Sequence, residues 1–250
     1  MERAESFMHR SSRRINGYPL DRHGAPDRMR PMNCLVTAGP TSEPIDRVRR
    51  LTNFSTGRLG TELAAHLSRT GHGVTLFRSE TATAAAPQDS MRVESFSTTE
   101  DLGRRLEALG ATPPDAVFHV AAVSDFTPGG LFHRGQDGGL ERVEGGKVSS
   151  RETGLLMELK PTRKLIAHFR EWYPASVLVG WKYEVDGGRD GACAAAMRQW
   201  RDCGLTATVV NGPAFGDGYG VIAGDGDMME CGTREVLFEV LGRLLTERNV

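Results

Sequence analysis

The stretch LTNFSTGRLGTELAAHLSRTGHGVTLF, residues 51–77, contains a polar loop, a helix and a strand in direct succession. Apolar residues recur at the spacing of a helix with one buried face: Leu59, Leu63, Ala64 and Leu67. Gly71 and Gly73 end this helix, and VTLF follows as a strand. Upstream, NCLVTAG at 33–39 is a short β-type run that ends in a Gly-Pro turn. Strand, helix and strand in this order predict two parallel strands joined by a right-handed crossover.

The same alternation continues to the end of the chain. Further helices are expected over 101–111, 164–172, 191–203 and 233–249. Buried strands are expected over 116–123, 176–183 and 206–210, and a short hairpin over 219–232. This pattern predicts an α/β fold, a three-layer α/β/α Rossmann-like sandwich around a mostly parallel mixed sheet, with ligands at the carboxyl ends of the strands.

Composition narrows the class of protein. The 250 residues are 39% hydrophobic and 25% charged, with a net charge of −1, so no overall field favours nucleic acid or an anionic membrane. No apolar run is long enough to span a bilayer. The four cysteines form no CxxC pair, which favours reduced thiols in a cytoplasmic protein. Residues 1–31 are rich in Arg, Ser, Gly and Pro and are predicted to be a disordered basic tail before a single domain at 32–250.

A Gly-rich segment around 126–147 interrupts the alternation of strands and helices. It is too long for a routine connection and has little apolar content. It is either a surface insertion or a flap over the site that delivers Lys147 once substrate is bound.

Three groups of polar residues are expected at one edge of the sheet. The loop before the first helix offers backbone N–H groups for an anion, although Asn53 and Ser55 there are also ordinary capping residues. At the end of a later strand, Ala121 and Ala122 leave room for a flat base or ribose, and Asp125 either binds ribose hydroxyls or opens the next turn. The third group is Lys147 with ELKPTRKL and VGWKYEVD, whose lysines are individually typical of solvated surface.

Two ligand chemistries fit these groups. A nicotinamide dehydrogenase is disfavoured because no tyrosine has a lysine four residues on and VTLFRSE lacks an immediate acidic residue for an NAD ribose. Nucleotide-driven ligation needs phosphate donors, a cation and a mobile lysine, and it fits better.

Five motifs in order resemble phosphopantothenoylcysteine synthetase, the ligase of coenzyme A biosynthesis. VTAGPTSEPIDRVRRLTNFSTGRLG at 36–60 follows the family pattern ITAGPTxExIDxVRxIxNxSSGxMG, and AAVSDF at 121–126 matches AAVSDF or AAVADY. GGKVSS, GLLMELKPTRKLI and VGWKYEVD are similar to three later segments of the family. The resemblance runs from about Asn33 to the C-terminal helix.

The resemblance implies a two-step ligation of 4'-phosphopantothenate to cysteine through an acyl-nucleotide. It assigns Asn53 to the acyl-phosphate intermediate, Lys147 to the phosphates and the developing oxyanion, and Arg49 to a nearby phosphate or structural role. Nucleotide and phosphate binding is assigned to Gly39, Ser55, Thr56, Gly57, Ala121, Ala122, Asp125, Trp181 and Asn211.

The family further implies Mg²⁺ carried by the nucleoside triphosphate with no protein metal site, a homodimer, and no FMN, since the flavin-dependent decarboxylase half is not expected in this chain. CTP and ATP both remain open, because Arg198 and Arg201 lie on a helix where bacterial members usually carry two lysines. The alternatives are a Rossmann-type NAD(P)-dependent oxidoreductase and a non-catalytic nucleotide-binding paralogue.

Overall fold

The computed structural model describes residues 14–15, 18–19, 30–87, 91–143 and 153–246. The chain divides into two compact units, Met1–Pro31 and Met32–Val250. In the first, β1 (Arg14–Ile15) pairs antiparallel with β2 (Tyr18–Pro19). The second contains all other elements. Among the described residues, no helix combines the length and the apolar character needed to cross a membrane.

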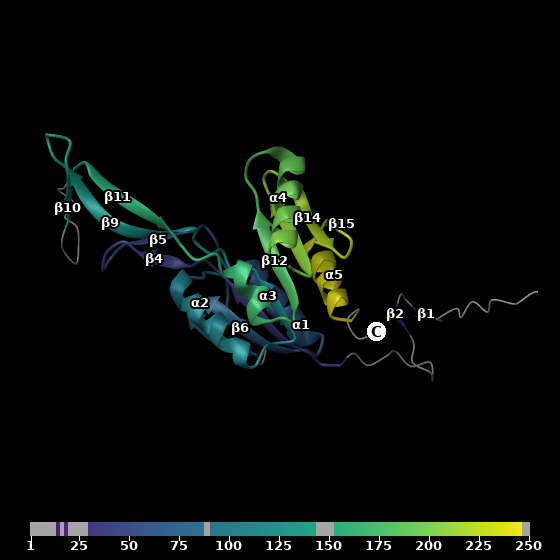
Figure 1. The fold of residues 1–250 in the computed structure, drawn as a ribbon. Coiled ribbons are helices and arrows are strands. Elements are labelled where there is room, and N and C mark those ends of the chain that lie inside the picture. The colour runs from purple at the N-terminus through teal and green to yellow at the C-terminus, as the bar shows by residue number, and fades with distance from the viewer. Residues whose placement is uncertain (1–13, 16–17, 20–29, 88–90, 144–152, 247–250) are drawn as a thin grey trace, which may run out of the picture. The chain divides into compact units, whose positions relative to one another are not determined.

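An eight-stranded sheet forms the centre of the second unit, in the order β15-β14-β13-β12-β8-β3-β6-β7 (Figure 1). The pairs from β13 to β7 are parallel, whereas β14 and β15 are antiparallel to their neighbours. This confirms the predicted mostly parallel mixed sheet. Its strands are β3 (Asn33–Ala38), β6 (Gly73–Ser79), β7 (Arg92–Phe96), β8 (Ala116–His119), β12 (Val177–Tyr183), β13 (Ala207–Gly212), β14 (Gly216–Ala223) and β15 (Asp227–Cys231).

Helices cover both faces of this sheet, which confirms the three layers. Side chains alternate along β3, so Val36 packs with α1 and α5 while Leu35 packs with α2 and α3 on the opposite face. The α4 helix covers the same face farther along, against β13 and β14. The helices are α1 (Arg58–Arg69), α2 (Thr99–Ala108), α3 (Phe169–Trp172), α4 (Gly188–Asp202) and α5 (Arg234–Thr246), with 3-10 turns η1 (Leu109–Ala111) and η2 (Leu165–His168).

The Gly-rich segment is more regular than the sequence indicates. β9 (Phe126–Arg134), β10 (Leu140–Arg142) and β11 (Leu155–Pro161) form a separate antiparallel sheet, here called the ribbon. Figure 1 shows the ribbon extending away from the central sheet, next to the short hairpin of β4 (Ser42–Pro44) and β5 (Arg50–Thr52). Its residues are half-buried or exposed on both faces, so the hydrophobic alternation that identifies a strand is missing.

Two other predictions need correction, and one strand of the central sheet was missed. β7 was not predicted, because at the sheet edge it buries only Phe96. The helix expected over 164–172 consists of η2 and the four-residue α3. The strand expected over 116–123 ends at His119, because the following residues turn to bond with the loop after β3.

Candidate functional site

A cavity of about 770 Å³ lies at the carboxyl ends of β3, β8, β12 and β13, the edge predicted for ligand binding. The structure brings ten of the predicted site residues to its walls: Gly39, Asn53, Ser55, Thr56, Gly57, Ala121, Ala122, Asp125, Trp181 and Asn211. The loop before α1, the loop after β8 and the ends of β12 and β13 are therefore neighbours in space. Lys147 lies outside the described residues.

Arg49 does not line this cavity. It lies in the connection between β4 and β5, where its Nε is 3.3 Å from the carboxylate of Asp46. The backbone N–H of Arg49 also donates to the Asp46 side chain at 2.7 Å. These contacts fix a tight turn between β4 and β5.

The start of α1 is shaped to receive an anion. Its N-cap is Gly57, at φ 76°, and no side chain caps this end, so neither Asn53 nor Ser55 acts as the cap. The hydroxyl of Thr56 accepts a bond from Arg58 N–H at 3.3 Å. The first turn of α1 also contains no acidic residue. The positive end of the helix dipole therefore faces the cavity without a competing side-chain anion.

Close backbone approach explains the glycines of this loop. A Cβ at Gly57 would lie 3.2 Å from the Cα of Gly39, and one at Gly60 would lie 2.8 Å from the Cβ of Ala38. Gly57 moreover has the left-handed conformation that L residues adopt at a cost. We call residues 53–60 the cradle, because they hold the start of α1 directly against the end of β3.

Asn53 connects the cradle to the loop after β8. Its side-chain amide nitrogen donates to the carbonyl oxygens of Ala122 at 3.3 Å and Val123 at 3.2 Å. The backbone of Ala122 bonds in turn to Gly39 O at 3.0 Å and to Thr41 N–H at 3.2 Å. The amide of Asn53 and these backbone bonds together hold the loop after β8 beside the cradle and the loop after β3.

A buried polar network supports the same loop from below. Thr41 Oγ1 accepts from Ser124 N–H at 2.9 Å and lies 3.1 Å from Thr99 Oγ1. The buried carboxylate of Glu43 accepts from both the N–H and the hydroxyl of Thr99, each at 2.8 Å. Sequence reasoning did not identify this role of Glu43, since a glutamate in a TSEP turn is indistinguishable from a surface residue.

His119 lines the cavity as a neutral imidazole. Burial, with a smaller contribution from the charge of Lys164, lowers the pKa of His119 to about 4. Its Nδ1 lies 2.9 Å from Thr37 Oγ1, which also accepts from Ala121 N–H at 3.1 Å. The Thr37 hydroxyl therefore donates a hydrogen bond to Nδ1, which is the acceptor nitrogen of the ring. The ring N–H of His119 is then at Nε2.

Asp125 opens the turn before β9, and its carboxylate also lines the cavity. It precedes β9 and its carbonyl oxygen accepts from Thr162 N–H at 3.0 Å, which closes the base of the ribbon. Its carboxylate lines the cavity and lies 3.0 Å from the ammonium of Lys164. Because both side chains are more than half exposed, this ion pair contributes little to stability and can be exchanged for contacts with a ligand.

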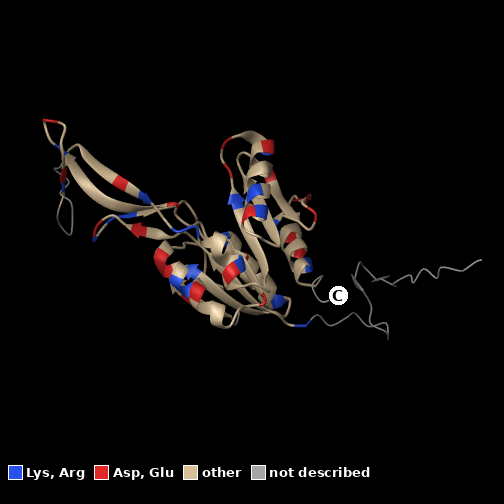
Figure 2. Ribbon diagram, in the orientation of Figure 1, with Lys and Arg blue, Asp and Glu red and all other residues tan. Residues whose placement is uncertain are grey.

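The cavity is more basic than the chain as a whole. One carboxylate, Asp125, lines it, against the side chains of Arg58, Arg163, Lys164, Lys182 and Arg234. Elsewhere acidic and basic residues are interspersed, as along α2 in Figure 2. The described residues include no group of three His, Cys, Asp or Glu side chains able to hold a metal ion.

The arginines of α4 do not reach the cavity. Arg198 and Arg201 are exposed, whereas Gln199 between them lines the wall and donates to Trp181 O at 3.2 Å. Arg234 and Tyr219 also line the cavity, and neither was predicted. Only their place in the chain could have indicated them. Tyr219 lies on β14, the strand that pairs with β13, and Arg234 begins α5.

Comparisons with known proteins agree with this geometry. The family model for the DNA/pantothenate metabolism flavoprotein C-terminal domain matches residues 29–212. The coenzyme A biosynthesis bifunctional protein CoaBC of Thermococcus kodakarensis is 31% identical over 195 residues, which are 78% of this chain and 44% of that protein. Its Bacillus subtilis counterpart is 29% identical over 167 residues, 66% of this chain and 38% of that protein. The chain therefore spans less than half the length of these curated relatives.

Solved structures share the fold. The crystal structure of the DNA/pantothenate metabolism flavoprotein from Streptococcus pneumoniae has a TM-score of 0.76 and 26% identity, and the match covers 87% of this chain and 99% of that one. A Cab2 mutant in complex with phosphopantothenate-cysteine has a TM-score of 0.66 at 16% identity, covering 87% of this chain and 86% of that one, and supports the fold alone. On the family match, this chain belongs to the DNA/pantothenate metabolism flavoprotein C-terminal domain family.

Proposed function

We propose that this protein is a phosphopantothenate–cysteine ligase. The observation that carries the proposal is the meeting of three separate motifs, around Asn53, Ala121–Asp125 and Trp181, in one basic cavity at the carboxyl edge of the sheet. The names of its relatives place those proteins in coenzyme A biosynthesis, and one structural relative binds phosphopantothenate-cysteine.

The proposed reaction has two steps. A carboxylate oxygen of 4'-phosphopantothenate forms a bond to the α-phosphorus of the nucleotide, and pyrophosphate leaves. The amine nitrogen of cysteine then bonds to the acyl carbon, and the nucleoside monophosphate leaves with the bonding electrons of the acyl C–O bond. The amine releases its protons to solvent, so no redox partner is required.

The residues of the cavity suit these steps because they position and neutralise anions. The N–H groups at the start of α1 are assigned to a phosphate group, and the amide of Asn53 to the acyl-phosphate oxygens. Ala121, Ala122 and Asp125 are assigned to the nucleoside, together with Trp181 and Asn211 at the ends of β12 and β13. Positioning of two bound substrates can supply much of the rate enhancement in such a transfer.

The proposed reaction also needs Mg²⁺ and a nucleoside triphosphate, either CTP or ATP. The described cavity offers a single carboxylate, Asp125, which does not form a resident Mg²⁺ site. We therefore propose that Mg²⁺ enters on the triphosphate. Gln199 lines the cavity wall, whereas its charged neighbours Arg198 and Arg201 do not. The α4 helix therefore contributes a neutral amide to the cavity.

A homodimer in the cytoplasm is also proposed. Large apolar side chains are exposed on the ribbon, among them Phe126, Leu156 and Leu159. An exposed apolar face of this kind is typical of a surface that associates with a partner.

The test is to supply the purified protein with 4'-phosphopantothenate, Mg²⁺ and either CTP or ATP, with and without cysteine. The expected result is pyrophosphate release and a cysteine-dependent product with the mass of phosphopantothenoylcysteine, with one nucleotide preferred. Absence of both products with a substrate that a known ligase converts would overturn the proposal. Tight NADPH binding with hydride transfer would favour the oxidoreductase alternative instead.

A further inference from the structure

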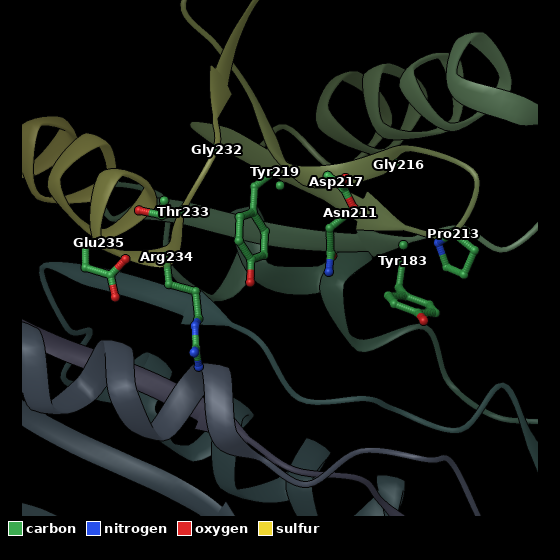
Figure 3. A pocket seen from close by; sticks show the side chains of 12 residues that line it. Tyr183, Asn211, Pro213, Gly216, Asp217, Tyr219, Gly232, Thr233, Arg234 and Glu235 are labelled. Atoms are coloured by element: carbon green, nitrogen blue, oxygen red, sulfur yellow. The ribbon is translucent and has the colours of Figure 1, made fainter.

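A second cavity, of about 610 Å³, lies next to the first at the ends of β13 and β14 and the start of α5. The two cavities share four wall residues, Tyr183, Asn211, Tyr219 and Arg234. Figure 3 shows Arg234 and Tyr219 pointing in the same direction from the start of α5 and from β14, with Asn211 farther along the same wall. A ligand in the second cavity would therefore be adjacent to whatever occupies the first.

Arg234 is held in place at the boundary of the two cavities. Its Nη1 donates to Glu62 on α1 at 2.5 Å. Glu62 also accepts an ion pair from Arg58 Nε at 3.2 Å, so two guanidinium groups share one carboxylate and leave an excess of positive charge. A guanidinium has five N–H donors, and the described residues engage only Nη1 of Arg234. The remaining donors can bind a second carboxylate.

The second cavity also offers an acceptor for a cation. Asp217 at the start of β14 lines it and makes no hydrogen bond or ion pair with any residue in the described part of the chain. Glu235 is different, because its own backbone N–H and the Thr233 hydroxyl lower the pKa of this carboxylate and already bind it. The cavity therefore combines one cationic group, Arg234, with one available carboxylate, Asp217.

Glycines bring the backbone close to the space of the second cavity. Gly212, Gly216, Gly218 and Gly232 all line it. At Gly218, which has φ 80°, a Cβ would lie 2.6 Å from Cys231 O, so no larger residue fits there.

We propose that the second cavity binds the zwitterion of a small α-amino acid, with its α-carboxylate on the Arg234 guanidinium and its ammonium group facing Asp217. This inference rests on the proposed function, in which that amino acid is cysteine. The shared wall then places the amine next to the cavity in which the acyl-nucleotide forms.

A phosphate group on Arg234 is the competing occupant. Both classes of ligand are anionic, and a guanidinium binds either in bidentate geometry. The two carboxylates on the wall, Asp217 and Glu235, disfavour a dianionic phosphate but attract an ammonium group. The electrostatics therefore favour the amino acid.

The test compares cysteine with cysteamine, which lacks the carboxylate. In the wild-type protein we expect a KM for cysteine roughly ten- to a hundredfold below that for cysteamine, the range of one charge-assisted contact. Arg234→Ala should raise the KM for cysteine by that factor and leave the KM for cysteamine unchanged. Arg234→Lys should recover part of the loss, because it keeps the charge but not the bidentate geometry.

Two further variants separate recognition from structure. Glu62→Gln removes the ion pair with Arg234 but keeps the guanidinium, so it should preserve the preference for cysteine over cysteamine. Asp217→Asn should raise the KM for both amines, since both have an ammonium group. If Glu62→Gln abolishes the preference as completely as Arg234→Ala, Arg234 acts only through the ion pair and the proposal is wrong.

The first half-reaction distinguishes failure of this inference from failure of the proposed function. Because Arg234 also lines the first cavity, pyrophosphate release without cysteine, measured in a single turnover, should fall in Arg234→Ala by a much smaller factor than the KM for cysteine rises. If Arg234→Ala instead raises the KM for 4'-phosphopantothenate, the guanidinium binds phosphate and the amino-acid site is excluded. If the wild-type protein releases no pyrophosphate, the proposed function itself has failed. In that event, cysteine binding by calorimetry in wild type and Arg234→Ala still decides whether the zwitterion site exists.

Discussion

The cradle lines the cavity, whereas the ribbon only begins and ends beside it, next to Asp125 and Thr162, and the two are built on different physical principles. In the cradle, backbone meets backbone at distances that exclude a Cβ, and Asn53 bonds it to the neighbouring loop. In the ribbon, strands pair through backbone hydrogen bonds, but none of the described helices covers them and Phe126, Leu156 and Leu159 remain exposed. The cradle depends on residue size, whereas the ribbon depends on backbone pairing.

The comparison shows where substitutions are tolerated. The cradle positions dipoles and amide groups, and a shift of a fraction of an ångström there changes what they bind. At the base of the ribbon Thr162 donates to Ser124 O and to Asp125 O, and β9 also contacts β4. Since no residue of β9, β10 or β11 lines the cavity, we expect their side chains to vary with less effect on it.

The largest effect is expected for Asn53→Asp in the cradle. A carboxylate cannot donate to the carbonyl oxygens of Ala122 and Val123, and it repels the phosphate groups assigned to this place. We expect kcat for amide formation to fall roughly a hundred- to a thousandfold, as for loss of a transition-state donor. Nucleotide affinity, measured by calorimetry, should fall much less. Unchanged turnover would contradict the role of Asn53.

Lys147→Gln tests whether Lys147, in the connection between β10 and β11, takes part in the reaction. Loss of the ammonium group should lower kcat by about a hundredfold, because the developing charge loses a cation. Nucleotide binding should again change less than turnover. Lys160→Gln, an exposed lysine on β11 that does not line the cavity, is the matched control and should retain full activity.

Gly57→Ala tests the close packing of the cradle. The left-handed conformation costs an L residue roughly 1–2 kcal/mol, and the new Cβ would also meet Ala82 at 3.1 Å and Gly39 at 3.2 Å. We expect the free energy of unfolding in urea to fall by about 2–3 kcal/mol.

Gly71→Ala is its control. Gly71 has φ 94° but open space around its Cβ position, so only the backbone cost applies. Equal losses in the two variants would show that the cradle has room for a methyl group.

His119 predicts a pH dependence of stability. Its pKa is about 4 in the folded protein and about 6.5 when unfolded, so the unfolded chain alone binds this proton between those values. The stability from a neutral His119 is complete above about pH 6.5 and is lost as pH falls toward 4. Between pH 7 and pH 5, wild type should lose about 2 kcal/mol more than His119→Asn, measured by denaturant unfolding. Parallel pH profiles would contradict the buried neutral imidazole.

The smallest effect is expected on the ribbon. Leu159→Ser removes an exposed side chain on β11 and should change the unfolding free energy of the monomer by no more than about 0.5 kcal/mol. Leu63→Ala, at a fully buried position of α1, should cost roughly 2–5 kcal/mol in the same assay. A loss above about 2 kcal/mol in Leu159→Ser would indicate that a partner surface covers this face.

Much of the fold follows from local pattern. The strands of the central sheet that are buried on both faces were predictable from continuous apolar runs, and α1 from its 3.6-residue period. The edge strand β7 and the ribbon were not, because a strand that buries one residue or none leaves no periodic signal. The order of the strands also required parallel pairing between segments as distant as β3 and β8.

The sequence by itself determined that the cradle, the Ala121–Asp125 loop and the end of β12 would meet, because carboxyl ends of parallel strands share one edge of a sheet. Only the tertiary structure decided which charged residues reach that edge. Arg234 arrives from a helix far along the chain, whereas Arg49 is turned toward Asp46 and Arg198 points to solvent. The reason is that a side chain's direction depends on how its element packs, and that packing is set by contacts between residues distant in sequence.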